Sequence, residues 1–295
     1  MEKRNIHKRF DPNDEREYVI AEWVDKIFNQ YIRKVDTEDT PNLFSLSSVA
    51  AIKINNAFEE TEKRGSSEGK EELKRRVAEK LAKFSSQVDL NRVRGWLDEI
   101  KRAYRALGFS VIDLTAKLTY KGLVGAGSGF GHTAFEVGLA FDPILNVPYM
   151  PGSGIKGAAR AAAELFMNGD RVEMFFGDDS VGRLDFHDAY PVQAGVRGYL
   201  LVPDVMTPHY SRGGQDILGE DKAHLTPIPF MAIAPETTFR FLIADRKGNL
   251  SDAKEVVRAV AVAFSNGLGA KTSIGYGVFE LLNASFETGG KDARR

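Results

Sequence analysis

The sequence contains no cysteine among its 295 residues. This absence excludes disulfide scaffolds, thiol catalysis and cysteine-ligated zinc, and it favours a reducing, cytoplasmic setting. The sequence also lacks any apolar run of about 18 residues, so we expect no transmembrane helix and no membrane partner. The N-terminal stretch MEKRNIHKRFDPNDERE has no apolar core, which argues against a signal peptide.

No charge of one sign dominates the chain. Its 40 lysine and arginine residues are balanced by 41 aspartate and glutamate residues, which gives a formal net charge of −1. The chain is therefore not a generic polycation, and any bound nucleic acid needs a local basic patch or an assembly to hold it. Hydrophobic residues make up 43% of the sequence, which is enough to bury a core and to exclude a disordered chain.

The chain changes character near residue 110. Before this point glycine is scarce, and apolar residues recur at the spacing of amphipathic helices. Helices are expected over residues 20–35, 43–60, 73–84 and 93–107. We interpret residues 1–109 as a helical extension that packs on the core, and residues 110–295 as a second domain.

The second domain alternates strands and helices. Strands are expected over residues 111–120, 182–188, 237–244 and 274–286, and helices over residues 154–167 and 252–265. Alternation in the first strand predicts one buried face and one solvent face that carries Asp113. The order of these elements predicts an α+β, ferredoxin-like (RRM-like) domain. Such sheets recur in RNA-binding proteins, but a fold alone does not give a function.

A long insertion separates the second and third expected strands. Residues 190–227 hold four prolines and show little periodicity, so we expect no regular structure there. A structureless insertion of this length in a compact domain is usually functional.

The first candidate site is the glycine-rich stretch GLVGAGSGFG, residues 122–131. Its glycines free the backbone to present N–H groups to an anion. They alternate rather than follow the pattern G-x-G-x-x-G before a helix, so a dinucleotide-binding loop is excluded. A flexible, bulged hairpin is the alternative interpretation.

The second candidate is VPYMPGSGIKGAAR, residues 147–160. After a turn at Pro151, Ser153 is expected to cap a helix. Lys156 stands in its first turn, where the helix dipole disfavours a cation by about 0.3–1 kcal/mol. A phosphate bound at this helix end would reverse that sign and accept free N–H groups, with Arg160 on the same helix face. The alternative is two solvated side chains on an ordinary helix.

The third candidate is NGLGAKTSIGYG, residues 266–277, which follows the last expected helix. Lys271 and Thr272 offer a cation and a hydroxyl, and Tyr276 offers an aromatic ring for base stacking. Ala270 precedes Lys271, so the stretch is not a Walker A loop. The alternative is a plain glycine-rich turn.

Acidic and histidine side chains form a weaker group of candidates. Aspartates and a histidine between residues 178 and 188 are of the types that bind metals. Strand alternation separates Asp188 from Asp185 and His187, so we expect a turn and a polar strand face there rather than a metal site. His209 in the insertion is a candidate acid–base group, but spacing places no second catalytic partner beside it.

The motifs are more specific together than alone. The run VGAGSGFGHTAFEVGLAFDPILNVPYMPGSGIKGAAR (124–160) and the C-terminal GAKTSIGYGVF (269–279) resemble the RAMP superfamily of CRISPR proteins. Within it, the chain looks most like the sixth-subunit family of the type III-B Cmr effector complex. The resemblance covers residues 120–285. Gly154 stands where the family often has a second serine, which leaves one fewer hydroxyl near a bound phosphate.

The resemblance implies a non-catalytic backbone and assembly subunit in antiviral defense. Such a subunit binds guide RNA (crRNA) near its 3′ part and supports the capture of target RNA. The implied protein partners are the repeated backbone subunit, the small helical subunit and the neighbouring end subunit. No cofactor and no metal are implied. Target cleavage belongs to another backbone subunit, and this sequence shows no clear equivalent of its catalytic aspartate.

The resemblance also assigns RNA contacts to residues of this sequence. The backbone donors are Gly125, Gly127, Ser128 and Gly129. The phosphate contacts of the helix are Lys156 and Arg160. The contacts from the C-terminal loop are Lys271, Thr272 and Tyr276. The insertion 190–227 becomes a thumb that wedges between guide and target, with His209, Tyr210 and Arg212 at its tip. Two alternatives stay open: a metal-independent endoribonuclease of the superfamily using His132 or His209, and a small-molecule enzyme with a phosphate site.

Overall fold

The computed structural model describes residues 24–25, 41–61, 68–178, 181–206, 211–212, 215–216 and 228–289. Most of the helix expected over residues 20–35 lies outside these residues, as do His209 and Tyr210. Arg212 is described through its backbone alone. In the described part of the chain, no helix combines the length and apolarity that a bilayer crossing requires.

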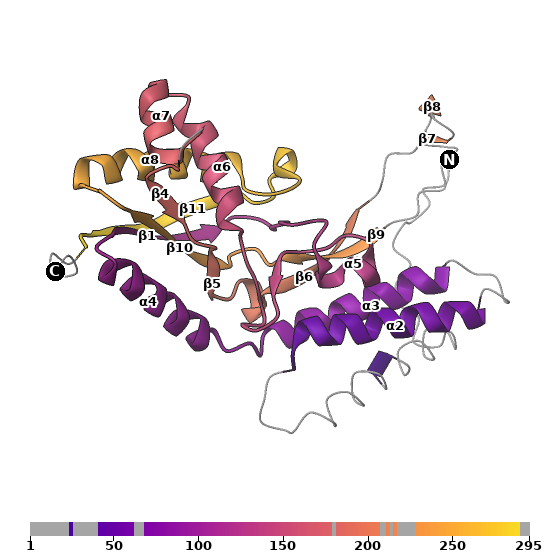
Figure 1. Cartoon of the computed structure of the whole chain (residues 1–295). Helices are drawn as coiled ribbons and strands as arrows, with labels where there is room; N and C mark the ends of the chain where they lie inside the picture. Colours follow the sequence, from indigo (N-terminus) through magenta and orange to yellow (C-terminus); the bar gives the residue numbers. More distant parts are fainter. Residues whose placement is uncertain are drawn as a thin grey trace.

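An antiparallel sheet forms the centre of the molecule (Figure 1). Its strands run in the order β11 (Phe279–Glu287), β1 (Ser110–Leu118), β10 (Thr238–Asp245) and β4 (Leu184–Phe186), and β5 (Tyr190–Gln193) also pairs with β10. Leu118 pairs with Phe279 and Lys117 with Thr238, whereas Ser110 pairs with Asp245 at the opposite end of β1. The expected α+β class is confirmed.

Helices cover both faces of this sheet (Figure 1). On one face lie α6 (Gly152–Ala163), α7 (Gly169–Phe176) and α8 (Leu250–Asn266), and on the other lies α4 (Leu90–Ala106). The prediction that β1 turns one face to solvent is wrong, because α4 covers that face. Asp113 is only 8% exposed and accepts hydrogen bonds from Arg240 and Lys101. An alternating pattern cannot distinguish a solvent face from one covered by paired charges.

Two further helices pack on the same core. Helix α2 (Leu43–Thr61) contacts α3 (Glu68–Ser85) and the short α5 (Gly129–Phe135). Helix α3 contacts the strands β6 (Leu201–Met206) and β9 (Ile228–Ile233). The start of α2 is fixed to a turn of the second domain, since Asn146 Oδ1 accepts a hydrogen bond of 2.7 Å from the Leu43 N–H. The buried residues of α2, α3 and the sheet belong to the same hydrophobic core.

The expectation of an irregular insertion is wrong for its first part. Strand β5 joins the main sheet, and β6 (Leu201–Met206) forms a ribbon with β9 (Ile228–Ile233). Both β5 and β6 contain a proline, which is tolerated in a strand whose N–H faces no partner. The short β7 (Ser211–Arg212) and β8 (Gln215–Asp216) also pair.

Other boundaries shift by a few residues. Helix α6 begins at Gly152 rather than at residue 154, and Pro151, not Ser153, stands at its N-cap position. Strand β11 begins at Phe279, because residues 272–274 form a short 3₁₀ turn. The two-residue strands β2 (Phe141–Asp142) and β3 (Val147–Pro148), the 3₁₀ turn Val196–Gly198 and helix α7 were not expected.

Candidate nucleic-acid interface

Backbone hydrogen bonds join the candidate loops side by side. The Ala270 N–H donates to Leu123, the Ala140 N–H to Val124, and the Tyr149 N–H to Ala140, at 2.7, 2.7 and 3.1 Å. We call the four segments in this series, 268–270, 122–124, 138–140 and 148–150, the loop ladder. Each segment is hydrogen-bonded to the next, from the C-terminal loop to the residues just before the Pro151 turn. The sequence motifs therefore converge at the end of the sheet where β1 ends and β11 begins.

The arrangement of the helices agrees with this convergence. Figure 1 shows the start of α6 and the loop after α8 on the same face of the sheet. Helices α6 and α8 pack against each other, and the Gly277 N–H donates to the Lys121 carbonyl just after β1, at 2.9 Å.

The first glycine-rich stretch forms a tight turn with an open tip. Gly125 has a φ of +70°, and a Cβ there would meet Ser128 Oγ at 2.6 Å and the Ala140 Cβ at 2.9 Å. The Ser128 N–H donates to the Gly125 carbonyl at 2.8 Å and is therefore already used. Gly127 and Gly129 are exposed, and within the described residues their N–H groups donate to no other group. Two backbone donors thus remain open to an anion.

The start of α6 already carries an anion of this chain. The Gly152 N–H donates to Asp188 Oδ1 at 2.7 Å, and a Cβ at Gly152 would clash with the Phe186 carbonyl oxygen at 2.1 Å. Ser153 makes no capping bond and is exposed, so the capping role expected for it is wrong. A carboxylate from a loop after β4 takes the place at the helix N-terminus that we expected a phosphate to fill.

The two cations of α6 differ in their surroundings. Lys156 is half-buried, and its side chain makes no hydrogen bond or ion pair with any other described residue. Arg160 donates to the Gly177 carbonyl at 2.8 Å and forms an ion pair with Glu164 at 3.3 Å. Lys156 is therefore free to meet an external phosphate, whereas Arg160 must share its guanidinium.

The C-terminal loop holds one cation over aromatic rings. Lys271 has a φ of +62°, and its Nζ lies 5.1 Å from the ring centroids of both Phe230 and Tyr276. Thr272 is half-buried at the start of the 3₁₀ turn. Tyr276 is only 4% exposed and meets Tyr120 edge-on, so the stacking on a base that we expected for it does not fit this geometry.

Asp204 of β6, which sequence reasoning missed, ties this loop to the insertion. It accepts a hydrogen bond from the Tyr276 hydroxyl and forms an ion pair with Lys121 Nζ at 3.0 Å. Burial raises the pKa of Tyr276, and the neighbouring Asp204 carboxylate raises it further. In the sequence, Asp204 is a single aspartate within the expected insertion. Nothing in its spacing distinguishes it from other surface aspartates, so the sequence alone does not select it.

The acidic candidates are used in other ways. Asp185 accepts a hydrogen bond from the Tyr104 hydroxyl at 3.0 Å, and His187 Nδ1 lies 2.7 Å from the Asp188 carbonyl. Among the described residues, no three histidine, aspartate or glutamate side chains converge as metal ligands do. His132 is exposed on α5 and has no acidic or basic partner in the described part of the chain.

Comparison with known proteins gives a consistent result. The curated protein "CRISPR system CMR subunit Cmr6" of Saccharolobus solfataricus is 29% identical over 255 residues, which cover 86% of this chain and 85% of that protein. A chain in the solved structure "Cryo-EM structure of the Type III-B Cmr-beta bound to cognate target RNA" superposes with a TM-score of 0.76 and 29% identity. That match covers 92% of this chain and 100% of the other.

The family comparison locates the match on the loops described above. Residues 123–280 match the RAMP superfamily. This span is more than half of the chain, and it includes the whole C-terminal loop (266–277) and all of the loop ladder except residue 122. The chain therefore belongs to the RAMP superfamily, as its motifs predicted.

Proposed function

We propose that this chain is a non-catalytic backbone and assembly subunit of a cytoplasmic type III-B Cmr effector complex. In this role it binds guide RNA phosphates near the 3′ part of the guide, supports capture of target RNA, and contacts the other Cmr subunits. The observation that carries the proposal is the loop ladder, which brings three RNA-binding candidates together at one end of the sheet. The likeness to Cmr6 and to a chain of an RNA-bound Cmr complex supports it.

The topology supports a ferredoxin-like core in this role. The strand order β11, β1, β10, β4, with α6 and α8 on one face, is the order expected of a split β-α-β domain. We propose residues 110–295 as this domain, residues 1–109 as the helical extension packed on it, and the insertion 190–227 as the thumb. His209, Tyr210 and Arg212 stay predictions for the thumb tip, and β6 forms its root on the body.

The contacts available suit phosphate rather than bases. The free N–H groups of Gly127 and Gly129, with Lys156 and Lys271, offer donors and cations that carry no sequence preference. Sequence is then left to base pairing between guide and target, as in other guide-directed effectors. With a net charge of −1, the isolated chain should bind RNA weakly and with strong salt dependence.

The absence of catalysis is part of the proposal. His132 directly follows the first glycine-rich stretch, and its side chain forms no hydrogen bond or ion pair with a described acid or base. An RNA-cleaving enzyme needs an acid and a base in reach of one phosphate. We therefore expect no RNA cleavage by the purified chain, and His132→Ala should leave RNA binding unchanged.

A paired substitution tests the proposal. In the co-expressed complex, Lys156→Ala with Arg160→Ala should reduce the amount of guide RNA that co-purifies. The control is Lys83→Ala with Lys254→Ala, which removes the same amount of charge from exposed lysines of α3 and α8. This control should leave the amount of co-purified guide RNA unchanged. Equal RNA retention by both variants would contradict the proposal. Cleavage of RNA that disappears with His132→Ala would favour the endoribonuclease alternative instead.

A further inference from the structure

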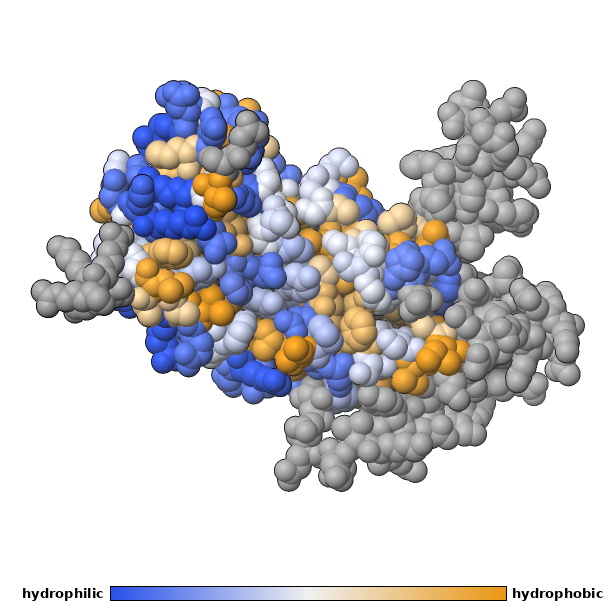
Figure 2. Space-filling model, in the orientation of Figure 1, coloured by the Kyte–Doolittle hydropathy of each residue, from blue (hydrophilic) through white to orange (hydrophobic). Residues whose placement is uncertain are grey.

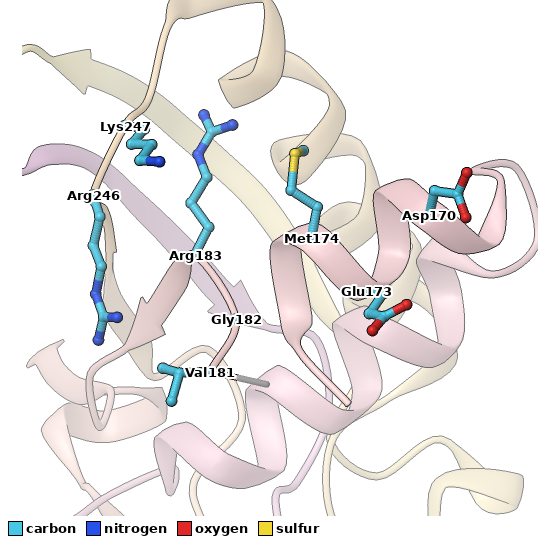
Figure 3. Close-up of a pocket in the computed structure, with 8 residues that line it drawn as sticks. All are labelled: Asp170, Glu173, Met174, Val181, Gly182, Arg183, Arg246 and Lys247. Carbon is cyan, nitrogen blue, oxygen red and sulfur yellow. The ribbon is translucent and has the colours of Figure 1, made fainter. Parts of the chain in front are cut away.

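A pocket lies at the opposite end of the sheet from the loop ladder. It has a volume of about 590 Å³ and is lined by α7, by the segment before β4 and by the turn between β10 and α8 (Figure 3). This turn follows Asp245, which pairs with Ser110 at the start of β1, whereas the ladder follows the end of β1. Its volume is in the range of pockets that bind ligands.

The two sides of the pocket carry opposite charges. Arg246 and Lys247 lie on one side, and Asp170 and Glu173 of α7 lie on the other (Figure 3). None of these four side chains forms an ion pair with another described residue. Arg183 between them is already used, because its guanidinium bonds both Asp245 and Asp252. Within the described residues, the pocket therefore has two cations on one side and two carboxylates on the other that form no ion pair.

Apolar side chains lie between the charged sides. Met174 is 41% exposed and Val181 is 79% exposed, and both line the pocket. Figure 2 shows mainly hydrophilic residues over α7 and α8. An occupant with an apolar centre would remove both apolar side chains from water.

We propose that this pocket docks a segment of a partner protein in which apolar residues are flanked by an acidic group on one side and a basic group on the other. The charge pattern favours protein over RNA, because Asp170 and Glu173 would repel a phosphate backbone. The inference goes beyond the proposed RNA-binding role and does not depend on it, since the pocket and the ladder lie at opposite ends of the sheet.

A labelled peptide tests the proposal with the full-length chain. The probe carries two glutamates, then Leu-Phe-Leu, then two lysines, and its binding is measured by fluorescence anisotropy. Two control peptides keep the apolar centre and carry only glutamates or only lysines. The mixed peptide should bind about fivefold more tightly than either control, because only it satisfies both sides of the pocket. Equal binding of the three peptides, or no binding at all, overturns the proposal.

Charge exchange in the protein sharpens this test. Arg246→Glu with Lys247→Glu, or Asp170→Lys with Glu173→Lys, should weaken the mixed peptide about fivefold. All four substitutions together restore the net charge of the pocket, with the acidic and basic sides exchanged. The mixed peptide should then bind again, in the opposite orientation. Failure of the fourfold variant to bind, with an unchanged melting temperature, overturns the proposal. So does loss of single-stranded RNA binding in the Arg246→Glu, Lys247→Glu variant without loss of peptide binding.

Discussion

The carboxylate of Asp188 accepts a hydrogen bond of 2.7 Å from the backbone N–H of Gly152, the first residue of α6. The helix that was expected to bind a phosphate at its N-terminus thus already has an internal anion there. The Asp188 carboxylate neutralises part of the positive charge at the N-terminal end of the helix dipole. The attraction of this helix end for an external phosphate is therefore weaker. An RNA phosphate at this end must bind beside Asp188, where Lys156 has no partner among the described residues.

Replacing Asp188 by asparagine tests this competition. Asp188→Asn keeps an acceptor for the Gly152 N–H but removes the charge, so the fold should lose only about 0.5–1 kcal/mol. RNA affinity should rise about two- to fivefold at low salt, because a repulsive charge is removed. Anisotropy titration with single-stranded RNA measures this change. The matched control is Asp185→Asn on β4, and an equal rise in both variants would show a general charge effect instead.

Two glycines of one turn should respond differently to alanine. Gly125→Ala should destabilise the fold by about 1–3 kcal/mol, because φ is +70° and the Ala140 backbone blocks the added Cβ. Gly127→Ala should leave the melting temperature unchanged, since no heavy atom lies within 4 Å of its added Cβ. If RNA approaches the Gly127 N–H closely, this second variant should still bind RNA several-fold more weakly. Unchanged RNA binding by Gly127→Ala would remove Gly127 from the interface.

Local patterns in the sequence were enough to find the loops but not their neighbours. Glycine spacing, the Pro151 turn and the helix periods are short-range properties, so the motifs and most elements of the main sheet were predictable. Asp188 caps α6 from 36 positions away, and Arg240 bonds Asp113 from 127 positions away. No period or spacing encodes such pairs, because the folded sheet alone brings them together. The burial of Tyr276, which does not fit the stacking role expected for it, also involves a distant residue, since its hydroxyl bonds Asp204 from 72 positions away.

The hydroxyl of Tyr276 should stabilise the C-terminal loop. Tyr276→Phe removes the hydrogen bond to Asp204 and should cost about 1–2 kcal/mol of unfolding free energy. Burial and then Asp204 raise the pKa of Tyr276, so its contribution should be present below pH 10 and be lost as the pH rises further. Urea unfolding at pH 8 and pH 11 measures both effects. A variant whose stability matches that of the wild type at pH 8 would show that the bond contributes nothing.

The buried Asp113 should make the protein sensitive to acid. Burial alone would raise the pKa of its carboxyl, but hydrogen bonds from Arg240 and Lys101 outweigh burial and hold the pKa below its ordinary value of 3.8. Stability from this group should therefore be present above pH 3.8 and be lost as the pH falls below it. Asp113→Asn should cost about 3 kcal/mol at pH 7 and flatten the loss at low pH. Glu99→Gln removes an exposed ion pair of α4 as control and should cost under about 1 kcal/mol.

Salt dependence distinguishes phosphate contacts from a loss of fold. Each cation that neutralises a phosphate of single-stranded RNA adds about 0.7 to the slope of log affinity against log salt concentration. Lys156→Ala should therefore lower the slope by about 0.7, and Arg160→Ala by less, because Arg160 also bonds Gly177 and Glu164. Titrations at several potassium chloride concentrations measure these slopes, with Lys254→Ala as the control for a distant lysine. If Lys156→Ala lowers the RNA affinity but leaves the salt slope unchanged, Lys156 supports the conformation of the loop without contacting a phosphate. The proposed RNA path would then have to avoid α6.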